Sequence, residues 1–454
     1  MNKAKKGLIG SATILGAGAF IAKLLGALYR IPLTNLLGSQ GLGLYQMVFP
    51  VYALLLDFSG AGVPNAIARI IASTDQVNRE YKAKSILYSS LRLLFYFGII
   101  CFLIMLIFSK LIASMQGNIN AYIGYIFLSP ALIFVSFISC YRGYFQGLMN
   151  MKPTAISQII EQVIKLLVGL FAVKRLMPNV ALAVGGATLA ITISEVVALI
   201  YLFISYKVSV KKHAGLFIYD KSAFSIESKH VLKTALPITL TGIMIPLSHL
   251  LDSFIIINLL SNYSNNATGL FGIFSGVNNT IINLPVSICY AIAMVAIPSV
   301  ANATKSQERQ NTINKSIILT LLISLPSAIT CAVFSKTIIG ILYRGLSYDE
   351  QAIASNLIRL TSCAIILLSL VQTLNGILIG QGKIYVPVFS LLIGTIIKIL
   401  SNLWLLNIPS INIYGAGLSL IACYFFTCLI NLIVVFNKGR INASKRIKVS
   451  KLAN

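Results

Sequence analysis

Two cations interrupt the first long apolar segment of the chain. Lys23 and Arg30 lie in the stretch AKLLGALYRIPLTNLLG, seven residues apart. Residues with this spacing lie on nearly the same face of an α-helix. A mid-membrane charge costs at least about 2.5–3.5 kcal/mol, so it normally faces a bundle interior or a wet cavity. Because lysine and arginine both bind phosphate, the pair predicts a cationic cavity that attracts an anionic substrate.

The rest of this helix face is compatible with that prediction and leaves one alternative. Gly16, Ala19 and Gly26 share the face with the two cations. Small residues let a neighbouring helix approach or leave room for a ligand. In the alternative, the Lys23 side chain extends to the membrane surface and Arg30 lies at the outer interface, and neither contacts a substrate.

A second group of intramembrane charges is expected near residue 160. Glu161 and Lys165 are four residues apart with the acid first, the favourable order for a helical ion pair. In one interpretation the ion pair is structural and only lowers the cost of inserting the helix into the membrane. In the other, Glu161 holds Lys165 in place as a phosphate contact. Lys398 occupies the matching place in the second half of the chain, with Gly394 where an acid would stand. Inside a bundle, Lys398 therefore needs another partner or an anionic ligand.

Further acids fall within apolar segments. Asp57 stands in the glycine-rich stretch DFSGAGVP, where a helix can bend or unwind, and Asp252 follows His249 by three residues on one helix face. An intramembrane carboxylate binds a coupling proton or cation, or it pairs with a cavity cation. We therefore predict Asp57, Glu161, Glu195 and Asp252 as coupling or counter-ion residues. A cycle driven by H⁺ or Na⁺ and one driven by the membrane potential both fit them.

The sequence lacks motifs for common enzymatic and metal-dependent chemistry. It contains no HExxH, GxSxG, Walker A or DxD motif. None of its seven cysteines forms a CxxC pair or has a histidine at ligand spacing, so we interpret them as small apolar core residues. No nucleic-acid-binding motif accompanies the basic residues. We predict a protein that is not an enzyme, binds no nucleic acid and uses no metal or cofactor beyond a coupling ion.

All these residues belong to a strongly apolar and basic chain. Of 454 residues, 57% are hydrophobic and 10% are charged, and the net charge is +25. The mean hydropathy is +0.87. Because soluble domains usually carry about 25% charged residues, this composition indicates an all-α polytopic membrane protein.

Twelve apolar segments are long enough to span a bilayer, which takes about 20 residues. Most cations gather in the two tails and in every second loop, which predicts multi-pass topology with both termini in the cytoplasm. The first apolar run exceeds the core of a signal peptide and contains a cation, so we expect it to remain as the first helix. The opposite loops hold only Lys110, Lys174, Arg175, Lys336 and Arg344. The predicted segments are residues 8–36, 42–73, 85–109, 120–147, 154–174, 181–206, 232–260, 270–301, 314–342, 353–380, 385–406 and 413–436.

The sequence contains signs of an internal duplication. Pro64 and Pro298 are 234 residues apart, and so are Pro153 and Pro387. Six spans per copy preserve the topology, so a parallel pseudo-repeat around a central cavity is expected. The predicted parts are an N-terminal six-helix lobe, a cytoplasmic linker, a C-terminal six-helix lobe and a basic cytoplasmic tail, at residues 1–206, 207–231, 232–437 and 438–454.

Several stretches resemble a known family. They are KLLGALYRIPLTNLLG, GLGLYQMVFPVYALLLDFSGAGVPNAIARIIA and, most specifically, YRGYFQGLMNMKPTAISQIIEQVIK at residues 141–165. These stretches resemble the polysaccharide-biosynthesis transporters, and within them the stage V sporulation protein B-like branch. This branch belongs to the multidrug/oligosaccharidyl-lipid/polysaccharide (MOP) flippase superfamily, and the resemblance covers most of the chain.

The resemblance implies two six-helix lobes with alternating access in the bacterial cytoplasmic membrane. It also implies a substrate, namely undecaprenyl-pyrophosphate-linked sugars moved from the inner to the outer leaflet. Peptidoglycan-precursor flippases of the superfamily carry paired first-helix cations, which Lys23 and Arg30 match with one residue of slack. Their further arginine in span two has no match here, where the chain reads PVYALLLDF. Lys165 and Lys398 are expected to assist the first-helix pair.

Two other functions remain open from the sequence. The intramembrane acids also suit a cation-coupled multidrug exporter of the same superfamily. A non-transporting scaffold for envelope or spore assembly is the third interpretation, although the short polar loops offer little docking surface. Expected partners are the lipid-linked glycan, the lipid bilayer and the envelope-synthesis machinery, and a role in sporulation follows from the resemblance alone.

Overall fold

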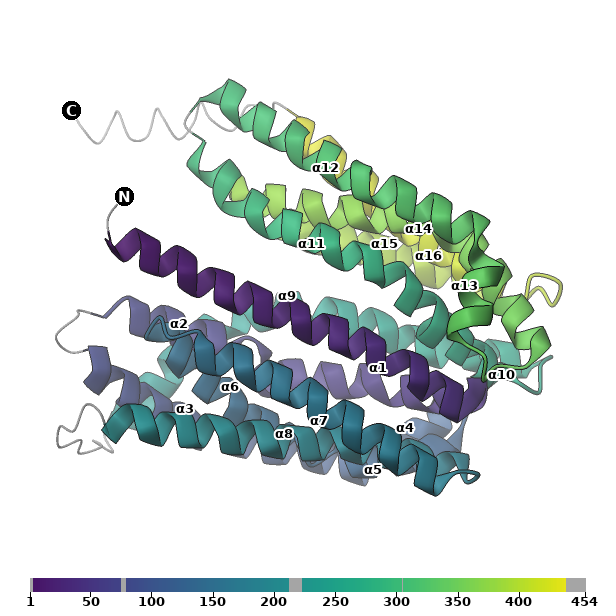
Figure 1. Ribbon diagram of the computed structural model, residues 1–454, viewed down its shortest axis with the longest axis horizontal. Helices are drawn as coiled ribbons and strands as arrows, with labels where there is room; N and C mark the ends of the chain where they lie inside the picture. The colour runs from purple at the N-terminus through teal and green to yellow at the C-terminus, as the bar shows by residue number, and fades with distance from the viewer. Residues whose placement is uncertain (1–2, 75–78, 212–222, 304, 438–454) are drawn as a thin grey trace. The chain divides into compact units, whose positions relative to one another are not determined.

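A computed structural model describes residues 3–74, 79–211, 223–303 and 305–437 (Figure 1). The described residues form helices joined by turns and short loops. The elements are α1 (Lys3–Leu56), η1 (Asp57–Ala61), α2 (Val63–Ala72), α3 (Arg79–Ile107), α4 (Ser109–Met115), η2 (Ile119–Ala121), α5 (Tyr122–Leu128), α6 (Ala131–Gly147), α7 (Lys152–Leu176), α8 (Val180–Lys211), α9 (Ala223–Ser261), α10 (Ala267–Gly272), η3 (Ile273–Asn278), α11 (Asn279–Asn302), α12 (Ser306–Val333), α13 (Ser335–Leu342), α14 (Tyr348–Gly380), α15 (Tyr385–Leu405) and α16 (Tyr414–Phe436).

The first predicted span, residues 8–36, lies in the first half of α1, and the second, residues 42–73, comprises the second half of α1 together with η1 and α2. The backbone leaves the helical region at Gly38, with φ 66° and ψ −174°, a conformation that glycine adopts at little cost. In Figure 1, α1 begins at the end marked N, and α2 lies at that same end, so the chain reverses direction between them. Among the described residues, ten further helical stretches are long and apolar enough to cross a membrane. Each overlaps one of the ten remaining predicted segments, which confirms the all-helical polytopic fold.

Two predicted spans end earlier than expected, and they do so in the same way. Segments 85–109 and 314–342 are each interrupted by a phenylalanine outside the helical region, Phe108 and Phe334. A Ser-Lys pair follows each one and begins a short helix, α4 or α13. Repetition of this break in both halves of the chain supports the predicted duplication.

Contacts between residues divide the chain into two compact units. Unit 1 comprises Met1–Ile281, Phe334–Leu360 and Ile399–Gly417, and unit 2 comprises Ile282–Val333, Thr361–Lys398 and Leu418–Asn454. The lobe boundary expected at residues 207–231 stays a prediction, because much of that segment lies outside the described residues.

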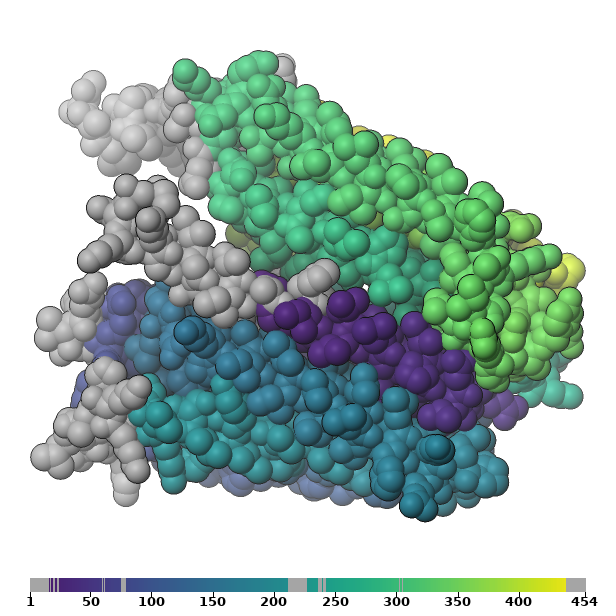
Figure 2. All heavy atoms as spheres, in the orientation of Figure 1, coloured from purple at the N-terminus to yellow at the C-terminus, as the bar shows by residue number. Residues whose placement is uncertain are grey.

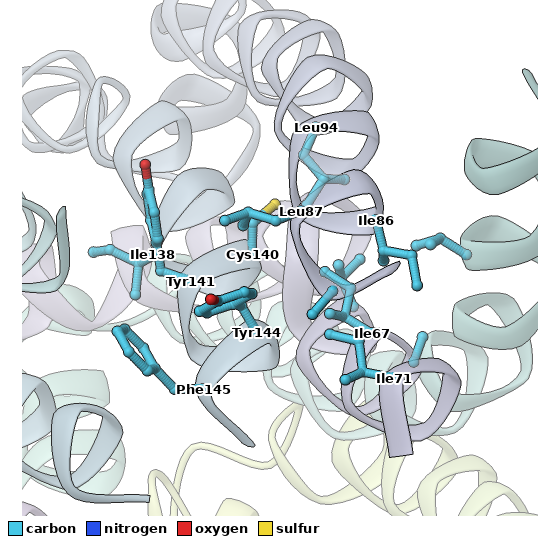
Figure 3. Packing of buried hydrophobic residues seen from close by; sticks show 14 of the residues in the cluster. Ile67, Ile71, Ile86, Leu87, Leu94, Ile138, Cys140, Tyr141, Tyr144 and Phe145 are labelled. Atoms are coloured by element: carbon cyan, nitrogen blue, oxygen red, sulfur yellow. The ribbon is translucent and has the colours of Figure 1, made fainter. Parts of the chain in front are cut away.

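The core of unit 1 contains a cluster of apolar side chains from α2, α3 and α6. Ile67, Leu87, Leu94, Tyr144 and Phe145 are all buried there, as Figure 3 shows. Helices α7 and α8 pack against each other, and their blue and teal atoms lie side by side in Figure 2. Unit 2 has its own core cluster, which includes Val300, Ile313, Leu374, Ile377 and Cys428.

The glycine-rich stretch after Asp57 departs from regular helix, as predicted. Residues Asp57–Ala61 form a π-helical turn, η1, and α2 resumes at Val63 with Pro64 in its first turn. Proline lacks a backbone N–H, so it fits the first turn of a helix without causing a kink, whereas farther along it bends the helix. The stretch therefore separates the second half of α1 from α2.

Candidate functional site

Close packing of α1 on α7 places their charged residues near one another. A Cβ atom built on Gly18 would lie 2.6 Å from Cβ of Ala155, and one on Gly26 would lie 3.1 Å from Oε1 of Gln162. Small residues on α1 thus let α7 approach, as the sequence predicted for Gly26, whereas Gly16 faces open space with nothing within 4 Å.

Lys165 lies beside an aromatic ring and among other charges. Its Nζ is 5.7 Å from the ring centroid of Tyr29 on α1, within the range of a cation–π interaction. The ammonium group also interacts electrostatically with Glu161, Arg30 and Glu195. Lys165 of α7 thus lies next to Tyr29, the residue that precedes Arg30 on α1.

Glu161 pairs with a residue that the sequence interpretation did not choose. Within the described residues, its ion-pair partner is Arg142 on α6, with 3.1 Å between Nη2 and Oε2, and not Lys165 as expected. Arg142 Nε donates to Ser157 Oγ at 3.1 Å, and Gln162 Nε2 donates to Glu161 Oε1 at 3.0 Å. The guanidinium reaches Glu161 because α6 and α7 are adjacent in space, so the i,i+4 pair does not form.

Glu195 adds a second carboxylate to this region from α8. Its exposed fraction is 5%. It interacts electrostatically with Glu161, Arg142 and Lys165. A carboxylate buried this deeply is stable as an anion only near compensating cations.

These residues form what we call the charge cluster: Arg30, Arg142, Glu161, Lys165 and Glu195. Three cations face two carboxylates, so the fully ionised cluster carries one excess positive charge. Arg30 Nη1 also donates to Thr280 Oγ1 at 3.3 Å. An excess cation beside partly exposed Arg30 and Lys165 suits an anionic ligand.

Sequence reasoning missed Arg142 and leaves Lys23 undetermined. The positive-inside pattern counted Arg142 with the cations that flank loops, because it lies near the end of a predicted span. One signal in the sequence could have identified this pair. Arg142 precedes and Glu161 follows the same short connection between two predicted spans, so the two side chains can meet when those helices pack side by side. Lys23 lies on α1, and its side chain is outside the described residues.

The other predicted site residues have surroundings of their own. Lys398 on α15 belongs to unit 2 and is only 3% exposed. Asp57 is in η1, next to Gly242 of α9. Asp252 on α9 is buried and accepts a hydrogen bond from Asn402 Nδ2 at 3.4 Å, with His249 Nδ1 4.0 Å away. Among the described residues, no three His, Cys, Asp or Glu side chains gather to hold a metal ion.

A family model agrees with this architecture. The model described as polysaccharide biosynthesis protein matches residues 8–304. The chain belongs to this family. A second model, MatE, matches residues 237–404, which confirms the resemblance to the MOP superfamily.

Relatives and solved structures support the same assignment. Stage V sporulation protein B of Bacillus subtilis (strain 168) is 24% identical over 95% of this chain and 84% of its own length. Lipid II flippase MurJ of the same organism is 25% identical over 91% of this chain and 79% of its own. An inward-facing multidrug resistance MATE transporter of the MOP superfamily has a TM-score of 0.78 at 14% identity, covering 95% of both chains. A MurJ structure in an inward closed conformation has a TM-score of 0.73 at 16% identity, covering 93% of this chain and 87% of its own. This family member is a multi-pass membrane transporter or flippase of the MOP superfamily.

Proposed function

We propose that this protein moves undecaprenyl-pyrophosphate-linked sugars across the bacterial cytoplasmic membrane by alternating access. The observation that carries this proposal is the excess cation of the charge cluster, with Arg30 and Lys165 both partly exposed. A pyrophosphate with attached sugars is too polar to cross hydrocarbon unaided. Cations in a wet cavity replace its hydration, while the undecaprenyl tail stays in lipid.

Each residue of the cluster has a part in this scheme. Arg30 and Lys165, together with Lys23, contact the pyrophosphate. Arg142 is a positioning residue, because its guanidinium pairs with Glu161, one helical turn before Lys165, and is itself held by Ser157. Lys398, which is buried in unit 2, contributes less. Relatives named for lipid II and for sporulation make a peptidoglycan or spore-envelope glycan the candidate cargo, with envelope-synthesis proteins as partners.

The energy source in this proposal is a coupling ion or the membrane potential. Asp57, Glu195 and Asp252 are the candidate coupling residues, and Glu161 acts as a counter-ion to Arg142. Asp252 is the strongest of the three because its buried carboxylate stands beside an amide and an imidazole. Such a site can bind H⁺ or Na⁺.

The same buried acid favours a second candidate function, cation-coupled multidrug export. A relative named as a probable multidrug resistance protein, YoeA of Bacillus subtilis (strain 168), is 21% identical over 82% of this chain and 79% of its own. Export of ethidium from intact cells, lost in Asp252→Asn, would favour this function over glycolipid transport.

Native mass spectrometry with undecaprenyl-pyrophosphate lipids tests the main proposal. Wild-type protein should retain the lipid, and Lys23→Ala/Arg30→Ala and Lys165→Ala should each lose it. The matched control is Lys174→Ala/Arg175→Ala, which removes two cations from the other end of α7. Equal retention of an uncharged polyprenol by the wild type, or equal loss in the control, would overturn the anion site.

A further inference from the structure

A polar cavity lies in unit 1 outside the charge cluster. Its volume is about 410 Å³, and it is found where α3 begins and where α6 and α8 end. These three helix ends lie on the side of the N-terminus, which the cation distribution predicts to be cytoplasmic. The polar lining residues are Arg79, Glu80, Lys84, Tyr144, Asn150 and Ser209.

An apolar cavity of about 330 Å³ lies deeper between the same helices. It is lined by Leu91, Phe137, Tyr141, Leu199, Ile200 and Phe203. Lys84 and Leu91 are seven residues apart on α3, or about 10 Å along the axis at 1.5 Å per residue. Tyr144 and Tyr141 are one turn apart on α6. On each helix the apolar lining residue is thus farther from the membrane surface than the polar one.

Aromatic side chains connect the two cavities. The Tyr206 ring centroid is 5.3 Å from that of Tyr144, which lines the polar cavity, and 5.6 Å from that of Tyr141, which lines the apolar one. Figure 3 shows Tyr141 and Tyr144 on the same helix, α6. Nearby, Lys207 Nζ lies 4.6 Å from the ring centroid of Phe203. Tyrosine and lysine are typical of the level where hydrocarbon meets headgroups.

We propose that the two cavities bind one anionic phospholipid of the leaflet on the N-terminal side. Lys84 and Arg79 bind the headgroup phosphate, and an acyl chain fills the groove lined by Leu91, Ile200 and Phe203. Charge complementarity selects this occupant, because two cations and one acid line the outer cavity, and only apolar and aromatic side chains line the inner one. Basic pockets between transmembrane helices are a recurrent form of lipid headgroup site.

The acid in the outer cavity limits the headgroups that fit. Glu80 lines the same cavity as Lys84 and Tyr144, and its carboxylate would repel a second anionic group beside the phosphate. A phosphodiester with a neutral polar headgroup, such as phosphatidylglycerol, therefore fits best. The site does not rest on the proposed transport function, because its lining comes from α3, α6 and α8 and includes no member of the charge cluster.

The test is native mass spectrometry of the full chain with phosphatidylglycerol and with phosphatidylethanolamine of identical acyl chains. Wild type should retain phosphatidylglycerol preferentially. Lys84→Gln should weaken that retention about fivefold, as expected for one cation near an anionic headgroup. Ile200→Trp, which fills the groove, should weaken it similarly. Lys305→Gln, which removes an exposed cation before α12, is the matched control and should have no effect.

Each contrary outcome identifies a fault in the proposal. Equal retention of the two lipids by the wild type would exclude a headgroup site. Equal loss in Lys84→Gln and Lys305→Gln would indicate general surface attraction, and no change in Ile200→Trp would exclude the groove. If Lys84→Gln unfolds on heating far below the wild type, Arg79→Gln takes its place. Lys165→Ala should still retain phosphatidylglycerol, which keeps this result separate from failure of the transport proposal.

Discussion

Helices α7 and α15 begin alike and then place their lysines in different surroundings. Pro153 lies in the first turn of α7 and Pro387 in the first turn of α15. A lysine follows each proline by about three turns, Lys165 in one helix and Lys398 in the other. The shared positions are those expected from the predicted duplication.

The position four residues before each lysine accounts for the difference. In α7 it is Glu161, which pairs with Arg142. In α15 it is Gly394, where an added Cβ would lie 2.3 Å from Thr427 Oγ1 on α16. One copy uses this position for a carboxylate and the other for close helix packing. The two helices therefore share the position of their lysine but not its surroundings, and only Lys165 belongs to the proposed anion site.

The largest expected effect is that of Arg142→Ala, which removes the partner of Glu161. It should lower the free energy of unfolding by at most about 3 kcal/mol, since loss of one partner leaves a largely buried carboxylate uncompensated. Transport of the lipid-linked glycan should fall to background. Thermal unfolding in detergent and a flipping assay measure the two effects. The double variant Arg142→Ala/Glu161→Ala should recover the stability of the wild type, but it should not recover transport. If both stability and transport recovered, the role of Arg142 would be structural alone.

Gly394→Ala should destabilise the packing of α15 on α16. Overpacking of this kind typically costs about 1–3 kcal/mol, and here the carbonyl oxygen of Cys423, at 2.7 Å from the added Cβ, belongs to the backbone. A lower midpoint of thermal unfolding is the expected result. Gly16→Ala on α1 is the control, because nothing lies within 4 Å of that position, and an unchanged midpoint for Gly394→Ala would contradict the packing explanation.

Binding of the pyrophosphate lipid should separate the two lysines directly. Lys165→Met should weaken binding about tenfold, as expected for loss of one charge-assisted hydrogen bond. Lys398→Met should weaken it less than about twofold, because Lys398 is buried in unit 2. Titration with the lipid, monitored by native mass spectrometry, measures both. Equal effects of the two substitutions would contradict the proposal that Lys165 on α7 contacts the lipid more strongly than Lys398 on α15.

The smallest effect is expected from Tyr29→Phe. This substitution keeps the ring that lies beside Lys165, and it removes a buried hydroxyl that has no hydrogen-bond partner among the described residues. Lipid binding should stay within about twofold of the wild type, while Tyr29→Leu should reduce it by more, since a cation–π contact contributes about 0.5–2 kcal/mol. Equal losses in both variants would point to the hydroxyl and not the ring.

The sequence by itself determined the class of protein, the helical segments and the irregular backbone after Asp57. These features depend on local properties: hydropathy over about 20 residues sets a span, and glycine and proline set where a helix bends. The charges of Arg30 and Lys165 were also evident, because any ionised group in an apolar segment requires a reason.

Only the tertiary structure decided which charges meet. Arg142 and Glu161 are 19 residues apart and on different helices, so no helical periodicity links them. The lipid groove likewise needs Leu91, Tyr141 and Phe203 from three helices at one depth. Hydropathy and helical spacing act along the chain, whereas ion pairs and cavities depend on which helices become neighbours, and that is settled by packing of side chains between helices.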